Sequence, residues 1–212
     1  MHNISINNVV ILNRNNTFNE RNTRLQYNLQ FRNTASLSAS VSNSDVNLLF
    51  PISFTRGIPL PVADYNYSQG SFSYRSDFRR TISYQASISA GKFYNGTART
   101  VRFSTTFRHQ PTINISLNLE YNKLEFPKQY GSAELFLVAS KFEFSFSTKL
   151  FWTTFLQYNT QGNNFNINSR FQYRFKPMSD IFLVYTDNYF TDPLFKNKNR
   201  ALVFKMNYWL NL

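Results

Sequence analysis

Strict alternation of apolar and polar residues over long segments is the feature that most constrains how this chain can fold. Between residues 113 and 122, apolar side chains occupy every second position: Ile113, Ile115, Leu117, Leu119 and Tyr121. The pattern recurs in five further segments: 24–32, 35–42, 81–90, 101–108 and 165–176. A period of two places successive side chains on opposite faces of a β-strand, whereas an α-helix repeats every 3.6 residues. The sequence therefore predicts an all-β fold.

The length of these segments indicates which all-β class the chain belongs to. We expect about twelve strands, at 3–13, 22–32, 34–43, 65–76, 79–90, 98–109, 112–123, 133–146, 149–160, 165–176, 180–190 and 200–212. Strands of globular proteins usually have about 5–6 residues, whereas a tilted strand that crosses a membrane needs about 9–11. The sequence therefore predicts an antiparallel up-and-down transmembrane β-barrel of about twelve strands, or the C-terminal part of a larger barrel.

The connections between the predicted strands support the same class. Short connections are expected at Asn33, 77–78, 110–111, 147–148 and 177–179. They alternate with longer ones at 14–21, 44–64, 91–97, 124–132, 161–164 and 191–199. Outer-membrane barrels have short periplasmic turns and longer extracellular loops, whereas the Greek-key connections of a soluble sandwich would not impose this alternation. We therefore expect the long connections to lie on the extracellular side.

The composition fits a barrel whose apolar face meets lipid and whose polar face lines the interior. The chain has 23 Phe and 13 Tyr, yet its mean hydropathy is −0.40 and charged residues make up only 16%. This aromatic content excludes a disordered chain, and the absence of cysteine excludes a disulfide scaffold. A membrane helix needs about 20 consecutive apolar residues, and the sequence contains no such run.

The net charge of +12 first suggests a nucleic-acid partner. However, the sequence contains no run of four basic residues, and no helix is expected to carry a basic patch. We therefore expect that the chain binds no nucleic acid. Nine basic residues fall instead on the inward faces of the predicted strands: Arg24, Arg32, Arg102, Arg108, Lys141, Arg170, Arg174, Lys176 and Lys205. Only Glu120 and Glu143 share these faces. An open lumen of this kind would favour anions, whereas a narrow lumen would use the same side chains to fill itself. The sequence leaves both possibilities open.

The last predicted strand is apolar and aromatic on one face, up to the end of the chain. Its residues Phe204, Met206, Tyr208, Leu210 and Leu212 resemble the C-terminal insertion signal of bacterial outer-membrane proteins. This resemblance implies that the barrel-assembly machinery and outer-membrane lipid are partners. Near Met1 the sequence has neither the basic flank nor the apolar core of a secretory signal, so we expect that any signal has been removed or lies upstream.

Five ordered stretches resemble a known family: Gly91–Thr97, Phe155–Asn159, Arg170–Pro177, Asp180–Tyr185 and Lys205–Leu210. From about residue 65 to 212, the chain is similar to the C-terminal part of an uncharacterised domain family of exported proteins, mainly from Bacteroidetes-type bacteria. In that family the domain follows a carbohydrate-binding, family-9-like (DOMON-like) sandwich. The resemblance implies that residues 1–212 are one barrel domain, the C-terminal portion of a longer protein of a Gram-negative outer membrane. The carbohydrate-binding module that this resemblance implies points to a glycan as a partner, and the basic lumen points to an anionic solute.

No pattern of catalytic, cofactor-binding or metal-binding residues stands out. The histidines His2 and His109 are far apart, and the candidate rim acids are scattered: Glu20, Glu125, Asp187 and Asp192. There is no cysteine, no histidine pair and no phosphate-binding loop. We therefore expect an anchor or a pore associated with a carbohydrate-binding module. Two alternatives are a soluble β-sheet that binds glycans through its aromatic face, and an outer-membrane hydrolase that depends on Asp192, Glu125 or His109.

Overall fold

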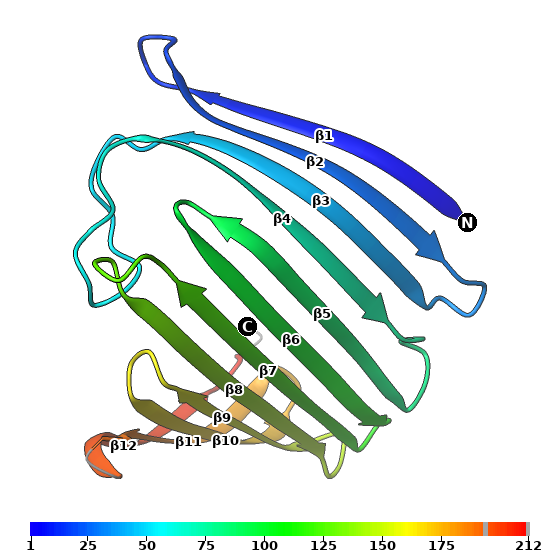
Figure 1. Cartoon of the computed structure of the whole chain (residues 1–212). Coiled ribbons are helices and arrows are strands. Elements are labelled where there is room, and N and C mark those ends of the chain that lie inside the picture. Colours follow the sequence, from blue (N-terminus) through cyan, green and yellow to red (C-terminus); the bar gives the residue numbers. More distant parts are fainter. Residues whose placement is uncertain (193–194, 211–212) are drawn as a thin grey trace. The chain divides into compact units, whose positions relative to one another are not determined.

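The computed structural model describes residues 1–192 and 195–210 and shows an all-β chain (Figure 1). Twelve strands form one sheet in which each strand pairs with its neighbours in the sequence, in the order β1 to β12. Their bounds are β1 His2–Leu12, β2 Phe18–Gln30, β3 Ser36–Asn47, β4 Asp64–Arg75, β5 Ile82–Phe93, β6 Gly96–His109, β7 Ile113–Glu125, β8 Ser132–Ser145, β9 Leu150–Asn159, β10 Asn164–Lys176, β11 Ser179–Phe190 and β12 Lys196–Asn207. The described residues include no helix long and apolar enough to cross a membrane. The predicted all-β, antiparallel up-and-down fold of about twelve strands is confirmed.

The end of the last strand differs from the prediction. A strand was predicted at 200–212, but the last strand, β12, begins at Lys196 and ends at Asn207. Tyr208 and Leu210 follow it outside the sheet. Asn207 pairs with Asp180, next to the first residue of β11, and beyond that point β11 offers no backbone partner. The chain instead donates a hydrogen bond from the Trp209 N–H to the Ser179 hydroxyl at 3.0 Å. Of the predicted insertion signal, Phe204 and Met206 lie in the strand, and Leu212 lies outside the described residues.

The predicted alternation of long and short connections holds in part. The connections 48–63 and 126–131 are each longer than the connections before and after them, as predicted, whereas 13–17 and 31–35 have equal lengths. The expected loop 91–97 is a tight turn at Tyr94 and Asn95, because β5 and β6 extend into it. Tyr94 has a positive φ of 51° in this turn. Alternation in the sequence marks where one face of a strand is apolar, but the hydrogen-bonded ladder continues past that point through residues that are polar on both faces.

The chain divides into two compact units, which are described separately. The first unit comprises Met1–Phe78, Tyr84–Phe103 and Glu120–Leu135. The second comprises Arg79–Ser83, Ser104–Leu119 and Phe136–Leu212.

In the first unit the strand register separates an apolar face from a polar one. One row of directly paired residues crosses five strands as Ile4, Tyr27, Ala39, Phe72 and Ile88. The adjacent row on the opposite face is Ser5, Gln26, Ser40, Ser71 and Ser89. Since a one-residue step along a strand moves a side chain to the other face, these two rows show that the sheet is sharply two-faced here.

The apolar face is open rather than packed into a core. Ile4 and Ile6 are each 72% exposed, and Val41 is 60% exposed. Among the described residues, the buried apolar side chains are Ala35 and Leu60, and neither belongs to a strand. In the second unit the row Phe144, Trp152, Phe171, Leu183 and Phe204 is apolar in the same way. A water-soluble chain of this length would instead bury its apolar face against a second layer.

Candidate pore-lining face

The polar face of the first unit is held together by side-chain hydrogen bonds between neighbouring strands. On β2, the Gln26 amide donates to the Ser38 hydroxyl on β3 at 3.0 Å, and Ser38 also bonds to Asn28 at 2.5 Å. Further along the same face, the hydroxyls of Ser40 and Ser71 are 2.8 Å apart. Small hydroxyl and amide groups thus form a hydrophilic surface that needs no apolar cover.

Two of the predicted inward cations lie on this face of the first unit. Arg24 stands on β2 opposite Asn7 on β1 and Ser42 on β3. Arg102 on β6 forms an ion pair with Glu120 on β7 at 2.9 Å, and both side chains remain partly exposed, at 56% and 30%. The pair extends by hydrogen bonds from Asn122 to Glu120 at 2.9 Å and from Thr100 to Asn122 at 2.7 Å. The prediction that Arg102 and Glu120 share one face is confirmed.

In the second unit, Lys141 and Glu143 on β8 form an ion pair of 2.6 Å. Asn114 on β7 donates to the same carboxylate at 2.6 Å, and Arg170 on β10 attracts it electrostatically. A second pair joins Arg174 on β10 to Asp180 on β11 at 3.2 Å. The cations of this unit are therefore arranged around carboxylates, yet they reach water, since the Lys141 side chain is 46% exposed and that of Arg174 is 45% exposed.

The remaining predicted cations are distributed as follows. Arg108 and Lys205 lie in β6 and β12, on the polar faces of those strands. Lys176 lies at the end of β10, next to a register shift, and its ammonium group is 3.3 Å from the Tyr208 hydroxyl. Arg32 lies outside the strands, in the turn between β2 and β3, because β2 ends at Gln30 rather than at residue 32 as predicted.

The polar face carries three further charged residues that were not predicted for it: Glu20, which was predicted as a rim acid, and Arg75 and Asp180, which were not singled out. Glu20 belongs to β2, which begins at Phe18 rather than at residue 22, and it shares a face with Arg24. Asp180 accepts hydrogen bonds from Gln172 and Arg174, and Arg75 on β4 donates to Gln85 at 3.1 Å. Each of the three follows the apolar–polar alternation of its strand, which indicates the polar face. All three lie at or near a strand end, where the alternation is short and predicts the face less well. On the described strands, cations still outnumber carboxylates on this face.

The long connection 48–63, here called loop 48–63, extends from β3 toward the ends of β7 and β8 in the first unit before it returns to β4 (Figure 1). It reaches the β7–β8 turn at 126–131, where the Ile58 N–H donates to the Gln129 carbonyl at 3.2 Å and the Thr55 hydroxyl donates to the Tyr130 carbonyl. A Cβ added at Gly57 would lie 2.5 Å from the Tyr130 backbone, so only glycine permits this approach. Loop 48–63 is thereby held at both ends by β3 and β4 and in its middle by the β7–β8 turn.

Aromatic packing also anchors loop 48–63. Phe54 contacts the rings of Phe93, Tyr94 and Phe126, with centroids 5.0, 5.2 and 6.0 Å apart. Phe93 in turn contacts Tyr67 on the same face at 5.6 Å. Burial in this cluster, together with nearby Glu20, raises the pKa of the Tyr94 phenol. These rings replace the hydroxyls and amides found further along the polar face, so the end of this face under the loop is aromatic.

The candidate rim acids do not converge on one site. Asp187 is fully buried on β11 and accepts hydrogen bonds from Tyr185, Tyr189, Asn197 and Arg200. Glu125 forms an ion pair of 2.9 Å with Lys123. His109 ends β6, and Asp192 follows β11. Within residues 1–192 and 195–210, no group of three or more acidic or histidine side chains could hold a metal ion.

The comparison with known proteins covers protein families, curated proteins and solved structures. No protein-family model matches the sequence, and no curated protein matches it. Among solved structures, the chain is similar to a "KdgM porin in complex with disordered oligogalacturonate", with a TM-score of 0.33 and 11% sequence identity over 88% of this chain and 89% of that one.

Proposed function

We propose that this chain is a membrane-spanning β-barrel domain of a bacterial outer membrane, with its apolar face in lipid and its polar face along an aqueous path. The observation that carries this proposal is the exposed apolar face. Its side chains are open in both units, and the described strands bury no apolar core. Only closed barrels and helices satisfy the backbone within lipid, so the proposal is of a closed barrel.

The polar face suggests the class of solute. Cations outnumber carboxylates on it, and several remain about half exposed within their ion pairs. Rings of basic side chains in a pore favour anions. We therefore propose an anion-preferring pore in which loop 48–63 narrows one entrance. We propose a glycan or another anionic solute, since the basic polar face favours anions and the resemblance of residues 65–212 implies an association with a carbohydrate-binding module.

Reversal potentials across planar bilayers in a salt gradient test the pore directly. The wild-type chain should conduct and should prefer chloride over potassium. Arg170→Gln removes a cation of the polar face and should shift the reversal potential toward cation preference. Arg21→Gln is the matched control, because Arg21 lies on the opposite face, paired with Asp45 at 2.7 Å. Insertion without any conductance, or a cation preference in the wild type, would contradict the anion pore and leave the anchor role.

The two alternatives are separated by extraction and by activity. A soluble glycan-binding sheet would leave the cell envelope without detergent, whereas an outer-membrane barrel needs detergent and migrates differently on gels before and after heating. A hydrolase would lose its activity when Glu125 is replaced. Because the carboxylate of Glu125 is already paired with Lys123, the structure favours a structural role for it.

A further inference from the structure

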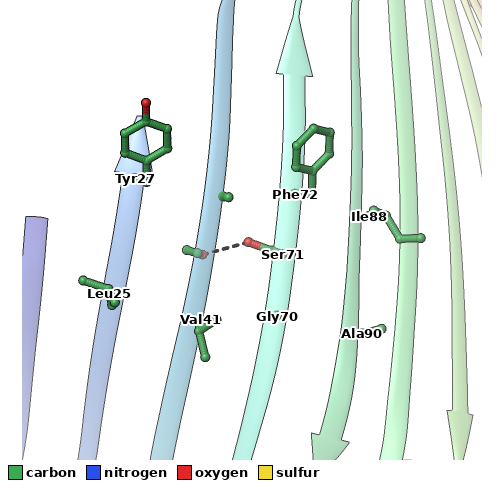
Figure 2. A pocket seen from close by; sticks show the side chains of 10 residues that line it. Leu25, Tyr27, Val41, Gly70, Ser71, Phe72, Ile88 and Ala90 are labelled. Atoms are coloured by element: carbon green, nitrogen blue, oxygen red, sulfur yellow. Dashed lines mark hydrogen bonds between the residues drawn. The ribbon is translucent and has the colours of Figure 1, made fainter. Parts of the chain in front are cut away.

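The apolar face of the first unit has a hollow that larger side chains could fill without disturbing the backbone. The hollow is about 540 Å³ in volume and crosses β2 to β5 (Figure 2). Its floor consists of the small residues Ala39, Gly70 and Ala90, and larger side chains such as Leu25 and Phe72 stand around it. Ligand pockets commonly measure about 300–1,000 Å³, so the hollow is large enough for part of a lipid-sized molecule.

Gly70 shows that the hollow is not forced by the packing of the chain. A Cβ added at this residue would meet a single atom within 4 Å, the Ala90 carbonyl oxygen at 3.9 Å. At Gly91, by contrast, an added Cβ would lie 2.3 Å from the Ser68 carbonyl oxygen, so the fold needs that glycine. A glycine within a strand weakens it and often marks a place where a ligand comes close to the backbone. Gly70 therefore points to an occupant outside the chain.

A second, polar hollow of about 450 Å³ lies nearer the strand ends, over β4 to β7. It is lined by Asn66, Lys92, Thr97 and Glu125, among others. Lys92 follows Ala90 on the same face of β5, about 7 Å further on, at roughly 3.3 Å per residue. Glu125 is already paired with Lys123, whereas Lys92 is exposed and forms no ion pair with any described residue. A cation without a partner thus stands where the apolar hollow gives way to the polar one.

We propose that the two hollows bind one phosphorylated glycolipid of the outer leaflet, of the lipid A class. An acyl chain lies over Gly70, the phosphate lies at Lys92, and the sugar hydroxyls meet the hydroxyl of Thr97. The charge of Lys92 complements the phosphate, and basic groups beside an apolar surface are a known way to recognise lipid head groups. The inference rests on the proposed function, because the apolar face must lie in lipid for the chain to meet such a molecule.

The test measures which lipid stays bound after extraction. The full chain is inserted into phosphatidylcholine vesicles that contain either lipid A or phosphatidylglycerol, then extracted in detergent and examined by native mass spectrometry. The wild type should retain lipid A in preference to phosphatidylglycerol. Gly70→Ile fills the apolar hollow and should abolish retention, and Lys92→Gln should lower it roughly fivefold, the contribution of one lysine near an anionic lipid surface.

Matched controls separate this site from general effects on the membrane face. Ser140→Ile places an isoleucine on the apolar face of β8, which does not line either hollow. Lys198→Gln removes an exposed cation of β12, which does not line either hollow. Both controls should retain lipid A as the wild type does. Normal insertion with no lipid A preference, or equal losses in the controls, would overturn the lipid site alone. Failure to insert, seen as unchanged gel mobility on heating, would overturn the proposed function together with the site.

Discussion

Replacing Ile88 by arginine tests whether the apolar face lies in lipid. Ile88 stands in the middle of β5, is 52% exposed, and belongs to the apolar row that contains Phe72 and Tyr27. In water, an exposed substitution of this kind changes stability by about 0.5 kcal/mol or less. In a bilayer, an arginine on the lipid face of a barrel near the midplane costs about 2–4 kcal/mol. The two environments therefore predict clearly different outcomes.

The expected cost corresponds to a large change in the folding equilibrium. Since about 1.4 kcal/mol is a factor of ten, Ile88→Arg should lower the equilibrium constant for folding into vesicles roughly 30- to 700-fold. Ser89→Arg is the control, because Ser89 is the next residue and lies on the polar face opposite Ser71. This control should change stability by less than about 1 kcal/mol, since the new charge remains in water.

Equilibrium unfolding by guanidinium in phosphatidylcholine vesicles, followed by tryptophan fluorescence, measures both variants. Trp152 reports on the change because it lies in β9, on the apolar face, and is 40% exposed. The shift of gel mobility on heating gives an independent readout of insertion. If Ile88→Arg and Ser89→Arg lowered stability equally, or if neither had an effect, the assignment of the apolar face to lipid would be refuted.

Two further predictions concern stability and the loop. Asp187→Asn should lower the guanidinium midpoint of unfolding more than Arg21→Gln does. Asp187 is fully buried and accepts four side-chain hydrogen bonds, whereas the Arg21 side chain is 51% exposed. Equal midpoints in the two variants would contradict this ranking. Phe54→Ala should raise the single-channel conductance, because it releases loop 48–63 from its aromatic contacts. Phe50→Ala, at a side chain that is 77% exposed, should leave the conductance unchanged. Equal conductance in the two variants would show that the loop does not narrow the pore.

Most of the fold could be predicted from the sequence, because alternation is a local property of each strand. The segment from Ile113 to Tyr121 shows this best, since every second side chain is apolar and the whole segment lies in β7. Strand ends were harder to predict, because they depend on partners elsewhere. β12 ends at Asn207 where β11 no longer offers a partner, although apolar residues continue to Leu210.

The polar face could be predicted in outline but not in its pairing. Alternation placed Arg102 and Glu120 on one face, and the structure pairs them. The ion pair of Arg174 with Asp180 depends on the register of β10 against β11, which no local pattern encodes. The docking of loop 48–63 on the β7–β8 turn joins segments 75 residues apart. Its hydrogen bonds end on backbone carbonyls, and the packing of Phe54 on Phe126 follows no local pattern, so the sequence could not predict it.

Accessibility along β2 tests the central claim most directly. Spin labels placed one at a time at Arg24, Leu25, Gln26, Tyr27 and Asn28, with the protein in phosphatidylcholine vesicles, can be probed with oxygen, which enters lipid, and with a water-soluble nickel complex. Oxygen should reach the labels at positions 25 and 27, and the nickel complex those at 24, 26 and 28, because β2 turns these two sets to opposite faces. If the nickel complex reached all five positions equally, the sheet would lie in water on both faces and the membrane assignment would be contradicted.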